Sequence, residues 1–149
     1  AFSPLMRGHE GLNPDLNVQF DANERVLHHS AEMSQLHKKL KPYMKSAVEQ
    51  NARKGVGVVR PLFFYYDEKP AYTECSEYML GRDILVAPVM QAGATEREVY
   101  LPEDEWIHLW SKKEYRGGRH KVSAELGRIP VFIRKKAQNV LALLKESSR

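Results

Sequence analysis

The chain has 149 residues, of which 42% are hydrophobic and 28% charged, and its formal net charge at pH 7 is +4. These proportions are typical of a soluble globular protein and exclude an intrinsically disordered chain. No apolar run approaches the roughly 18–20 residues that a membrane-spanning helix needs, so we expect no membrane partner.

The basic character of the chain raises the question of nucleic-acid binding, because the isoelectric point is about 9.2. Basic residues gather at 38–41, 112–113 and 134–136, but acidic residues lie between these groups. None has the aromatic interleaving of a nucleic-acid module, so we expect a solvated surface and no nucleic-acid partner. The single cysteine, Cys75, precludes an internal disulfide and favours a reducing, cytoplasmic location. We expect it to be a small core residue rather than a nucleophile.

The first elements predicted along the chain are a buried strand at 1–6, a loop at 11–21 and a long helical region. Apolar residues recur at spacings of three, four and seven from Val26 to Val48, which indicates one apolar helix face. Pro42 interrupts this pattern and would remove a helical hydrogen bond, so we predict two helical pieces, 22–40 and 42–54. Gly55 and Gly57 would end the second piece.

Short β-rich runs follow, separated by glycine and proline. We predict strands at 58–66, 84–90, 98–101, 106–110, 120–122, 129–133 and 140–144. Regular short strands with turn signals indicate a β-sandwich. The chain therefore divides near residue 57. Its first part is a single βα unit that cannot bury its own apolar faces, and such units belong in parallel barrels or sheets whose other members must precede it.

A cluster of charge follows the first predicted strand, comprising Arg7, His9 and Glu10. In α/β barrels this end of a strand faces the active site. A histidine there can exchange hydrogen bonds with sugar hydroxyls, and an arginine can hold a carboxylate. An ordinary charged loop explains the same three residues, and their spacing alone leaves both interpretations open.

The remaining candidates for chemistry have structural interpretations. His28, His29 and His37 lack nearby carboxylates or thiolates at metal-ligand spacing, so we expect a helix surface, no metal and no cofactor. Trp106 and Trp110 are four residues apart, and on a strand they would share one face as a packing stripe. The sequence has no glycine-rich phosphate loop and no nucleophile elbow.

Four stretches resemble glycoside hydrolase family 31, which contains α-glucosidases and α-xylosidases. "AFSPLMRGHEG" resembles the last barrel strand of the family with its R-x-H motif. "LKPYMKSAVEQNARKGVGVVRPLFFYY" resembles the final barrel helix and its continuation into a β-domain. "YMLGRDILVAPVMQAGATEREVYLPEDEWIHLW" and "RIPVFIR" resemble successive strands of that domain. The motifs keep the family order over nearly the whole chain.

The resemblance implies a fold of mixed class, α/β followed by all-β. Residues 1–57 would be the last βα unit of a (β/α)8 catalytic barrel, and residues 58–149 the proximal C-terminal β-sandwich domain. The family cleaves α-glycosides with retention, using two aspartates held about 5 Å apart. Both are expected upstream of Ala1, so no catalytic residue is expected in this chain, which alone would be inactive. The motif histidine falls on His9, implied to bind sugar hydroxyls, with Arg7 and Glu10 in supporting roles.

The form His9-Glu10-Gly11, together with "WIHLWS", is most similar to the sulfoquinovosidase branch, which cleaves α-glycosides of a 6-sulfonated glucose. That branch usually continues with N-R-P, whereas this chain has Leu12-Asn13-Pro14. The partners implied are an α-glycoside substrate and the upstream barrel of the same polypeptide. A plain α-glucosidase remains open. So does a free-standing carbohydrate-binding or scaffolding β-domain, and a basic nucleic-acid binder rests on the isoelectric point alone.

Overall fold

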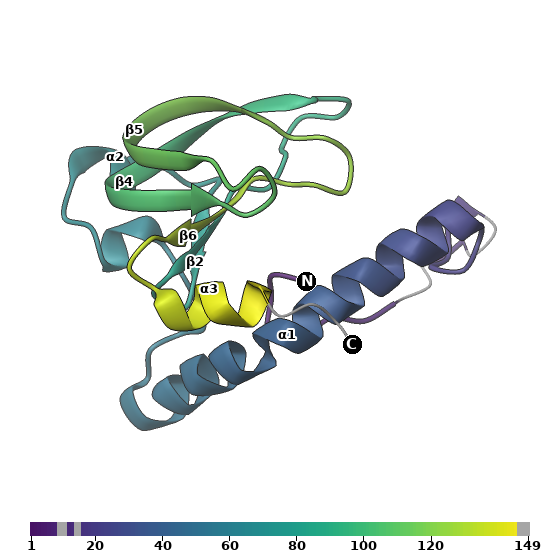
Figure 1. The fold of residues 1–149 in the computed structure, drawn as a ribbon, viewed down its shortest axis with the longest axis horizontal. Coiled ribbons are helices and arrows are strands. Elements are labelled where there is room, and N and C mark those ends of the chain that lie inside the picture. Colours follow the sequence, from purple (N-terminus) through teal and green to yellow (C-terminus); the bar gives the residue numbers. More distant parts are fainter. Residues whose placement is uncertain (9–11, 14–15, 146–149) are drawn as a thin grey trace.

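The computed structural model describes residues 1–8, 12–13 and 16–145. The helices and strands in chain order are α1 Glu24–Lys54, β1 Val59–Arg60, the 3₁₀ turn η2 Leu62–Phe64, α2 Lys69–Thr73, β2 Tyr78–Leu80, β3 Ile84–Val86, β4 Glu96–His108, β5 Glu114–Ser123, β6 Val131–Arg134 and α3 Gln138–Lys145. Figure 1 shows α1 as a long rod that extends well beyond the sheet, with α3 lying beside it. Within the described residues, no helix combines the length and apolarity needed to cross a bilayer.

The helix α1 runs unbroken through Pro42, so the prediction of two helical pieces is wrong. It begins where the Asn23 side chain accepts a hydrogen bond from the backbone N–H of Val26 at 3.0 Å. It ends at Gly55, whose φ of 67° is the left-handed conformation that glycine adopts without strain. The buried side chains Leu40 and Met44 lie on either side of the proline. Their packing offsets the one hydrogen bond that proline cannot donate.

Residues 1–6 do not form the predicted strand and have an irregular backbone. Phe2 is nevertheless buried, and its carbonyl accepts a hydrogen bond from the Tyr78 hydroxyl at 2.8 Å. A strand requires neighbours with which to exchange backbone hydrogen bonds. A barrel strand would find them on parallel strands, whereas every paired strand in the described part of the chain is antiparallel.

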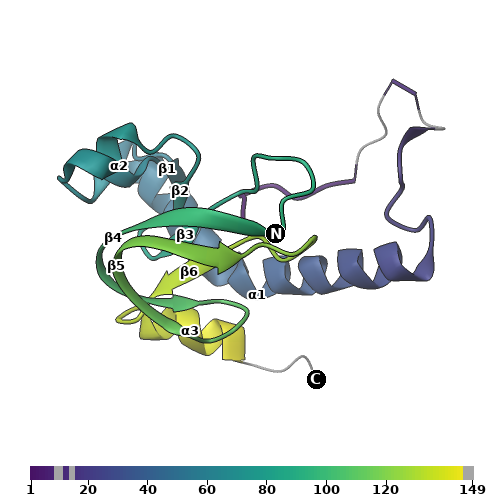
Figure 2. The ribbon, with the colours of Figure 1, turned by 90° about the horizontal axis from the view of Figure 1, so that it is seen from above.

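The strands form one six-stranded antiparallel sheet in the order β1-β2-β3-β6-β4-β5, rather than the two separate sheets expected of a sandwich. The edges are therefore β1 and β5. The predicted strand 98–101 and the first three residues of the predicted strand 106–110 fall on β4, whose pairing register with β5 shifts between Leu101 and Glu105. Pro102 lies within this irregularity, where a missing N–H is tolerated. Figure 2 shows β4 and β5 curving together as a long twisted hairpin.

The predicted strand at 140–144 is wrong, because these residues belong to helix α3. Val140, Leu141 and Leu144 follow the i, i+1, i+4 spacing of a helix face as well as a short apolar run, and all three pack against the core. The strand β2 and the short helix α2 were not predicted.

The core has two clusters on opposite faces of the sheet, because adjacent residues of the central strands point in opposite directions. Ile84 and Val86 of β3 face α1 and α3, together with Ile133 of β6. Leu85 and Phe132 face the other way and meet the fully buried Trp106 among others. The central strands are thus buried on both faces, and α1 is joined to the β-domain through the first cluster.

Candidate functional site

The predicted sugar-binding cluster is described only in part. Arg7 is exposed, and it lies in a segment that leaves the core after Phe2 and leads to the exposed start of α1. The ring of Phe20 lies against Gly8, close enough that a side chain there would contact it at 3.4 Å. His9 and Glu10 lie outside the described residues, so the assignment of the cluster stays a prediction.

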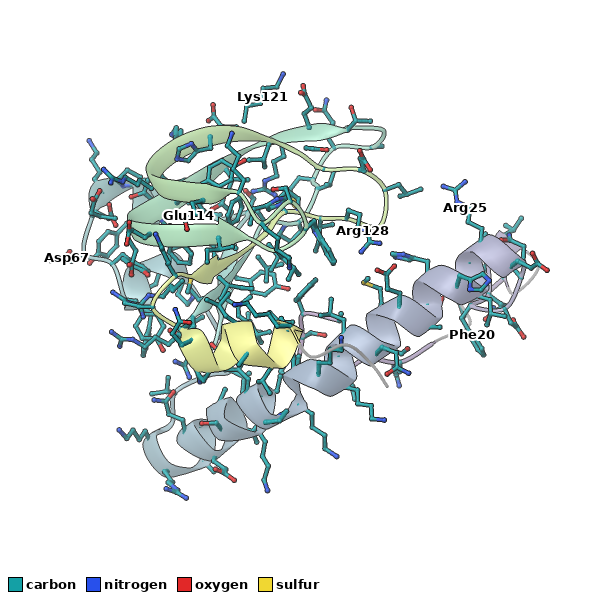
Figure 3. The ribbon with its side chains drawn as sticks, viewed as in Figure 1. Phe20, Arg25, Asp67, Glu114, Lys121 and Arg128 are labelled. Carbon is teal, nitrogen blue, oxygen red and sulfur yellow. The ribbon has the colours of Figure 1, made fainter. Side chains whose placement is uncertain are left out.

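The segment around Arg7 exposes many apolar side chains. Leu16 is 81% exposed and Phe20 is 58% exposed. Five more large apolar residues between positions 5 and 27 are also exposed: Leu5, Met6, Leu12, Val18 and Leu27. Scattered apolar residues on a surface are ordinary, but a concentration of them marks an interaction surface. Figure 3 shows Phe20 near the start of α1, at the end of the helix that lies farthest from the sheet.

A cavity of about 770 Å³ lies between the N-terminal half of α1 and the turn that joins β4 to β5. Its walls include Gln35, Lys39 and Lys112, and burial lowers the pKa of the Lys112 amine. Its carboxylates include Glu32, which is paired with Arg128 at 2.7 Å. Glu125 also lines the cavity.

The two tryptophans do not form the predicted stripe. Trp106 is buried on the second core cluster, and its indole N–H donates to the carbonyl of Pro102 at 2.9 Å. Trp110 lies beyond the end of β4 and packs against the first cluster instead. The Arg128 guanidinium lies 4.6 Å from the centre of the Trp110 ring, so neither indole presents a free platform for a sugar.

The histidines on α1 do not form a metal site. The Nδ1 atom of His37 lies 3.0 Å from the carbonyl oxygen of Ala1, and His29 packs near Gly127. Among the described residues, no group of three or more histidine, cysteine or acidic side chains is placed to hold a metal ion. Cys75 is exposed, so its expected place in the core is wrong.

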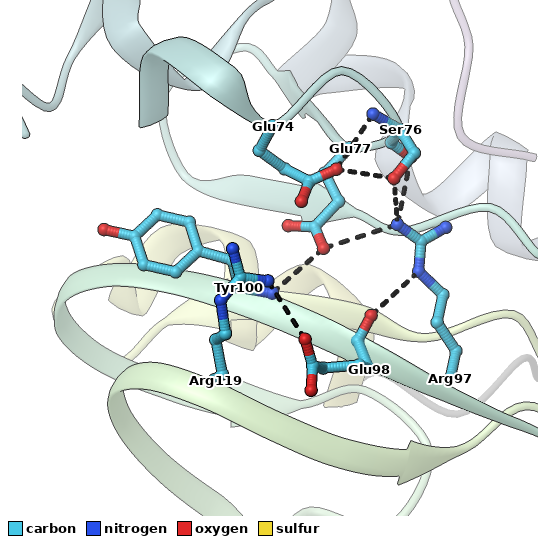
Figure 4. A network of polar contacts seen from close by, with 7 residues as sticks. All are labelled: Glu74, Ser76, Glu77, Arg97, Glu98, Tyr100 and Arg119. Carbon is cyan, nitrogen blue, oxygen red and sulfur yellow. Dashed lines mark hydrogen bonds and ion pairs between the residues drawn. The ribbon is translucent and has the colours of Figure 1, made fainter. Parts of the chain in front are cut away.

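A buried polar network escaped the sequence analysis. Glu77 is almost inaccessible to solvent, and its Oε1 accepts a hydrogen bond from the backbone N–H of Tyr100 at 3.0 Å. The same oxygen lies 3.4 Å from the Arg97 guanidinium, which also donates to the Ser76 hydroxyl at 2.6 Å. Burial raises the pKa of Glu77 to about 7. Figure 4 shows how this network joins the loop before β2 to β4.

The hydrogen bonds of the Glu77 network do not satisfy every polar atom in it. Glu77 Oε2 and Arg97 Nη1 are buried without a hydrogen-bond partner in the described part of the chain. A single glutamate ahead of a strand carries no sequence signal that it will be buried. Its contacts inside the fold come from Arg97 and Tyr100 of β4, which lie 20 and 23 positions further along the chain.

Comparison with known proteins places these observations in a family. Residues 55–137 match the model of the glycosyl hydrolase family 31 C-terminal domain. The sulfoquinovosidase of Escherichia coli (strain K12) is 48% identical over 135 residues, which cover 90% of this chain and 20% of that enzyme. The α-xylosidase of Saccharolobus solfataricus is 34% identical over 149 residues, covering 97% of this chain and 20% of that enzyme.

Solved structures agree with the sequence matches. A family 31 sulfoquinovosidase from E. rectale, in complex with the aza-sugar inhibitor IFGSQ, has a TM-score of 0.90 and 44% identity. The match covers 97% of this chain and 22% of that structure. The chain thus spans about a fifth of the length of these relatives. With a family model matching more than half of its residues, the chain belongs to glycoside hydrolase family 31.

Proposed function

We propose that this chain is the C-terminal part of a retaining α-glycosidase of the sulfoquinovosidase type. The observation that carries the proposal is a gap in sequence identity. Two sulfoquinovosidases are 48% and 47% identical to the chain. Six other family members, with names such as α-glucosidase, isomaltosyltransferase and α-xylosidase, are 28% to 34% identical.

Residues 1–57 belong, in this proposal, to the last βα unit of a (β/α)8 barrel formed by upstream sequence. Two observations support it. The relatives are about five times longer than the matched region. The exposed apolar side chains at positions 5–27 also need a covering surface, because apolar area left in water costs roughly 25 cal/mol per Å². A packed barrel would supply that cover.

The chemistry is divided between the two parts of the polypeptide. The two catalytic carboxylates lie upstream, about 5 Å apart across the glycosidic bond, as retention requires. His9 contributes hydrogen bonds to sugar hydroxyls, and these bonds strengthen as charge develops on the ring in the transition state. Arg7 and Glu10 support the loop that carries His9.

The test uses the complete polypeptide with two chromogenic substrates, 4-nitrophenyl α-sulfoquinovoside and 4-nitrophenyl α-glucoside. We expect a higher kcat/KM for the sulfoquinovoside. We expect His9→Ala to lower kcat/KM by roughly a hundredfold, since transition-state hydrogen bonds to the sugar are worth several kcal/mol. His28→Ala, an exposed histidine on α1, is the matched control and should keep wild-type activity.

Preference for the glucoside would refute the sulfoquinovosidase assignment and leave an α-glucosidase. Wild-type kinetics in His9→Ala would remove His9 from the site. Absence of turnover with every α-glycoside would overturn the glycosidase proposal as a whole.

A further inference from the structure

We propose that Trp110 and Arg128 of the β-domain form an anchor that fixes both ends of the segment carrying the sugar-binding residues. This segment comprises residues 3–23. The inference rests on the proposed function, because it gives Trp110 and Arg128 a positioning role in the same site. It concerns side chains distant in sequence from the R-x-H motif.

The first end of the segment is held through Phe2. Its ring meets the Trp110 ring edge to face, with centroids 6.2 Å apart and planes at 74°. Aromatic pairs favour this geometry. The Phe2 carbonyl also accepts a hydrogen bond from Tyr78. The chain therefore leaves the core from a fixed point immediately before residue 3.

The second end of the segment is held through the N-terminal half of α1. The three buried side chains of this helix all lie at Leu40 or beyond it. Just before them, Leu36 packs on the first cluster and His37 Nδ1 lies 3.0 Å from the Ala1 carbonyl oxygen, so the turns before Leu36 depend on other contacts. There Arg128 Nη2 lies 2.7 Å from one carboxylate oxygen of Glu32 and 2.9 Å from the other. Figure 3 shows Arg128 between the β-domain and this part of α1.

The neighbouring residue Gly127 brings the two surfaces together. Its φ of 83° is in the left-handed region, and a Cβ atom there would lie 2.6 Å from His29 Cε1. A side chain at this position would strain the backbone and displace the His29 ring. His29 and Glu32 are three residues apart, so they lie on one face of the helix. The loop that precedes β6 thus contacts α1 at two adjacent turns.

Trp110 and Arg128 join these two ends into one unit. The guanidinium lies over the indole face at 4.6 Å, and the indole N–H donates to the carbonyl of Ile129 at 2.7 Å. Trp110 therefore contacts both residues: its ring packs edge to face with Phe2, and the Arg128 guanidinium stacks on the face of its indole. Arginine suits this place because its planar group can stack and bind a carboxylate at the same time.

We expect the anchor to affect how accurately the segment is placed, and to have little effect on the free energy of folding. The Arg128–Glu32 pair is partly exposed, with 38% and 47% of the side chains accessible, so it adds little to folding. A loop fixed at both ends samples far fewer arrangements than one fixed at a single end. Misplacing a substrate-contacting group by about 1 Å can lower a rate by about a hundredfold. We therefore expect Arg128→Gln to lower kcat by roughly tenfold with little change in KM or thermal midpoint.

A matched control exists on β5. Arg119 pairs with Glu98 at 3.0 Å and stacks over Tyr100 at 5.8 Å, so it combines the same two interactions. It joins only the neighbouring strands β4 and β5. Arg119→Gln should leave both activity and the segment unchanged.

The experiment compares the complete wild-type polypeptide with both variants by steady-state kinetics and by hydrogen–deuterium exchange of peptides covering residues 3–8 and 16–23. We expect faster exchange and lower kcat in Arg128→Gln alone. If Arg128→Gln matches Arg119→Gln in exchange, or exchanges faster without loss of kcat, the positioning role is overturned. If the wild type turns over no α-glycoside while Arg128→Gln still exchanges faster, the proposed function fails and the structural anchor alone remains.

Discussion

Replacing Glu77 with glutamine should change how the stability of the protein depends on pH. The pKa of this carboxyl rises from 4.5 in an exposed chain to about 7 in the fold, because burial disfavours its charged form. At 1.36 kcal/mol per pH unit, this difference corresponds to about 3 kcal/mol. The side chain is fully buried, so solvent does not screen the effect appreciably.

The sign follows from which state ionises first. Below pH 4.5 the carboxyl is neutral in both states and carries no penalty. As the pH rises toward about 7, the Glu77 carboxyl ionises in the unfolded chain but stays neutral in the folded protein. The stability that this carboxyl contributes is therefore lost. Glutamine does not ionise. The free energy of unfolding of Glu77→Gln should therefore gain about 3 kcal/mol on wild type between about pH 4 and about pH 8.

Urea unfolding at one-unit pH intervals measures this difference directly. Glu98→Gln is the control, because Glu98 is 65% exposed and forms a similar ion pair with Arg119. Its difference from wild type should be small at every pH. A Glu77→Gln difference that stays constant across the range would refute the reasoning, since it would mean that the buried carboxyl ionises as easily as an exposed one.

Three further outcomes are expected. Gly81→Ala should cost about 2 kcal/mol or more, because Gly81 has a φ of 61° and a methyl group would overlap the Tyr43 hydroxyl, which makes two hydrogen bonds to backbone; an unchanged melting temperature would contradict this. Trp106→Phe should cost roughly 2–3 kcal/mol in urea unfolding, since it leaves a small cavity and removes the donor to Pro102, and a cost below that of a surface substitution would count against it. Cys75 should react fully with Ellman's reagent in the folded protein; protection until unfolding would show that it is covered.

Local patterns in the sequence predicted the elements well where the pattern was unambiguous. The apolar repeat from Val26 to Val48 predicted a helix, and the β-rich run that begins at Trp106 predicted a strand. The errors came from interactions that a local window does not contain. Packing of Leu40 and Met44 carried the helix through Pro42, and the core against α1 decided that Val140 is helical.

For the candidate site, a local sequence window revealed even less than it did for the fold. A motif predicted a role for Arg7 and for His9, although the structure describes only the first of these. The residues of the proposed anchor carried no signal, because Arg128 and Glu32 are 96 positions apart. Contacts of that separation depend on the complete topology of the sheet, and single residues such as Gly127 show their purpose only when their neighbours in space are known.

The placement of β5 at the edge of the sheet has a consequence for association between molecules. An edge strand presents unpaired backbone groups that can recruit another chain, and proteins commonly prevent this with charged side chains and irregular backbone. Here β5 carries Arg116, Arg119 and Lys121, and Gly118 within it has a φ of 120°. At the opposite edge β1 is only two residues long. A second copy approaching either edge would therefore meet charged side chains and irregular backbone, or too short a template, and both disfavour pairing between edges.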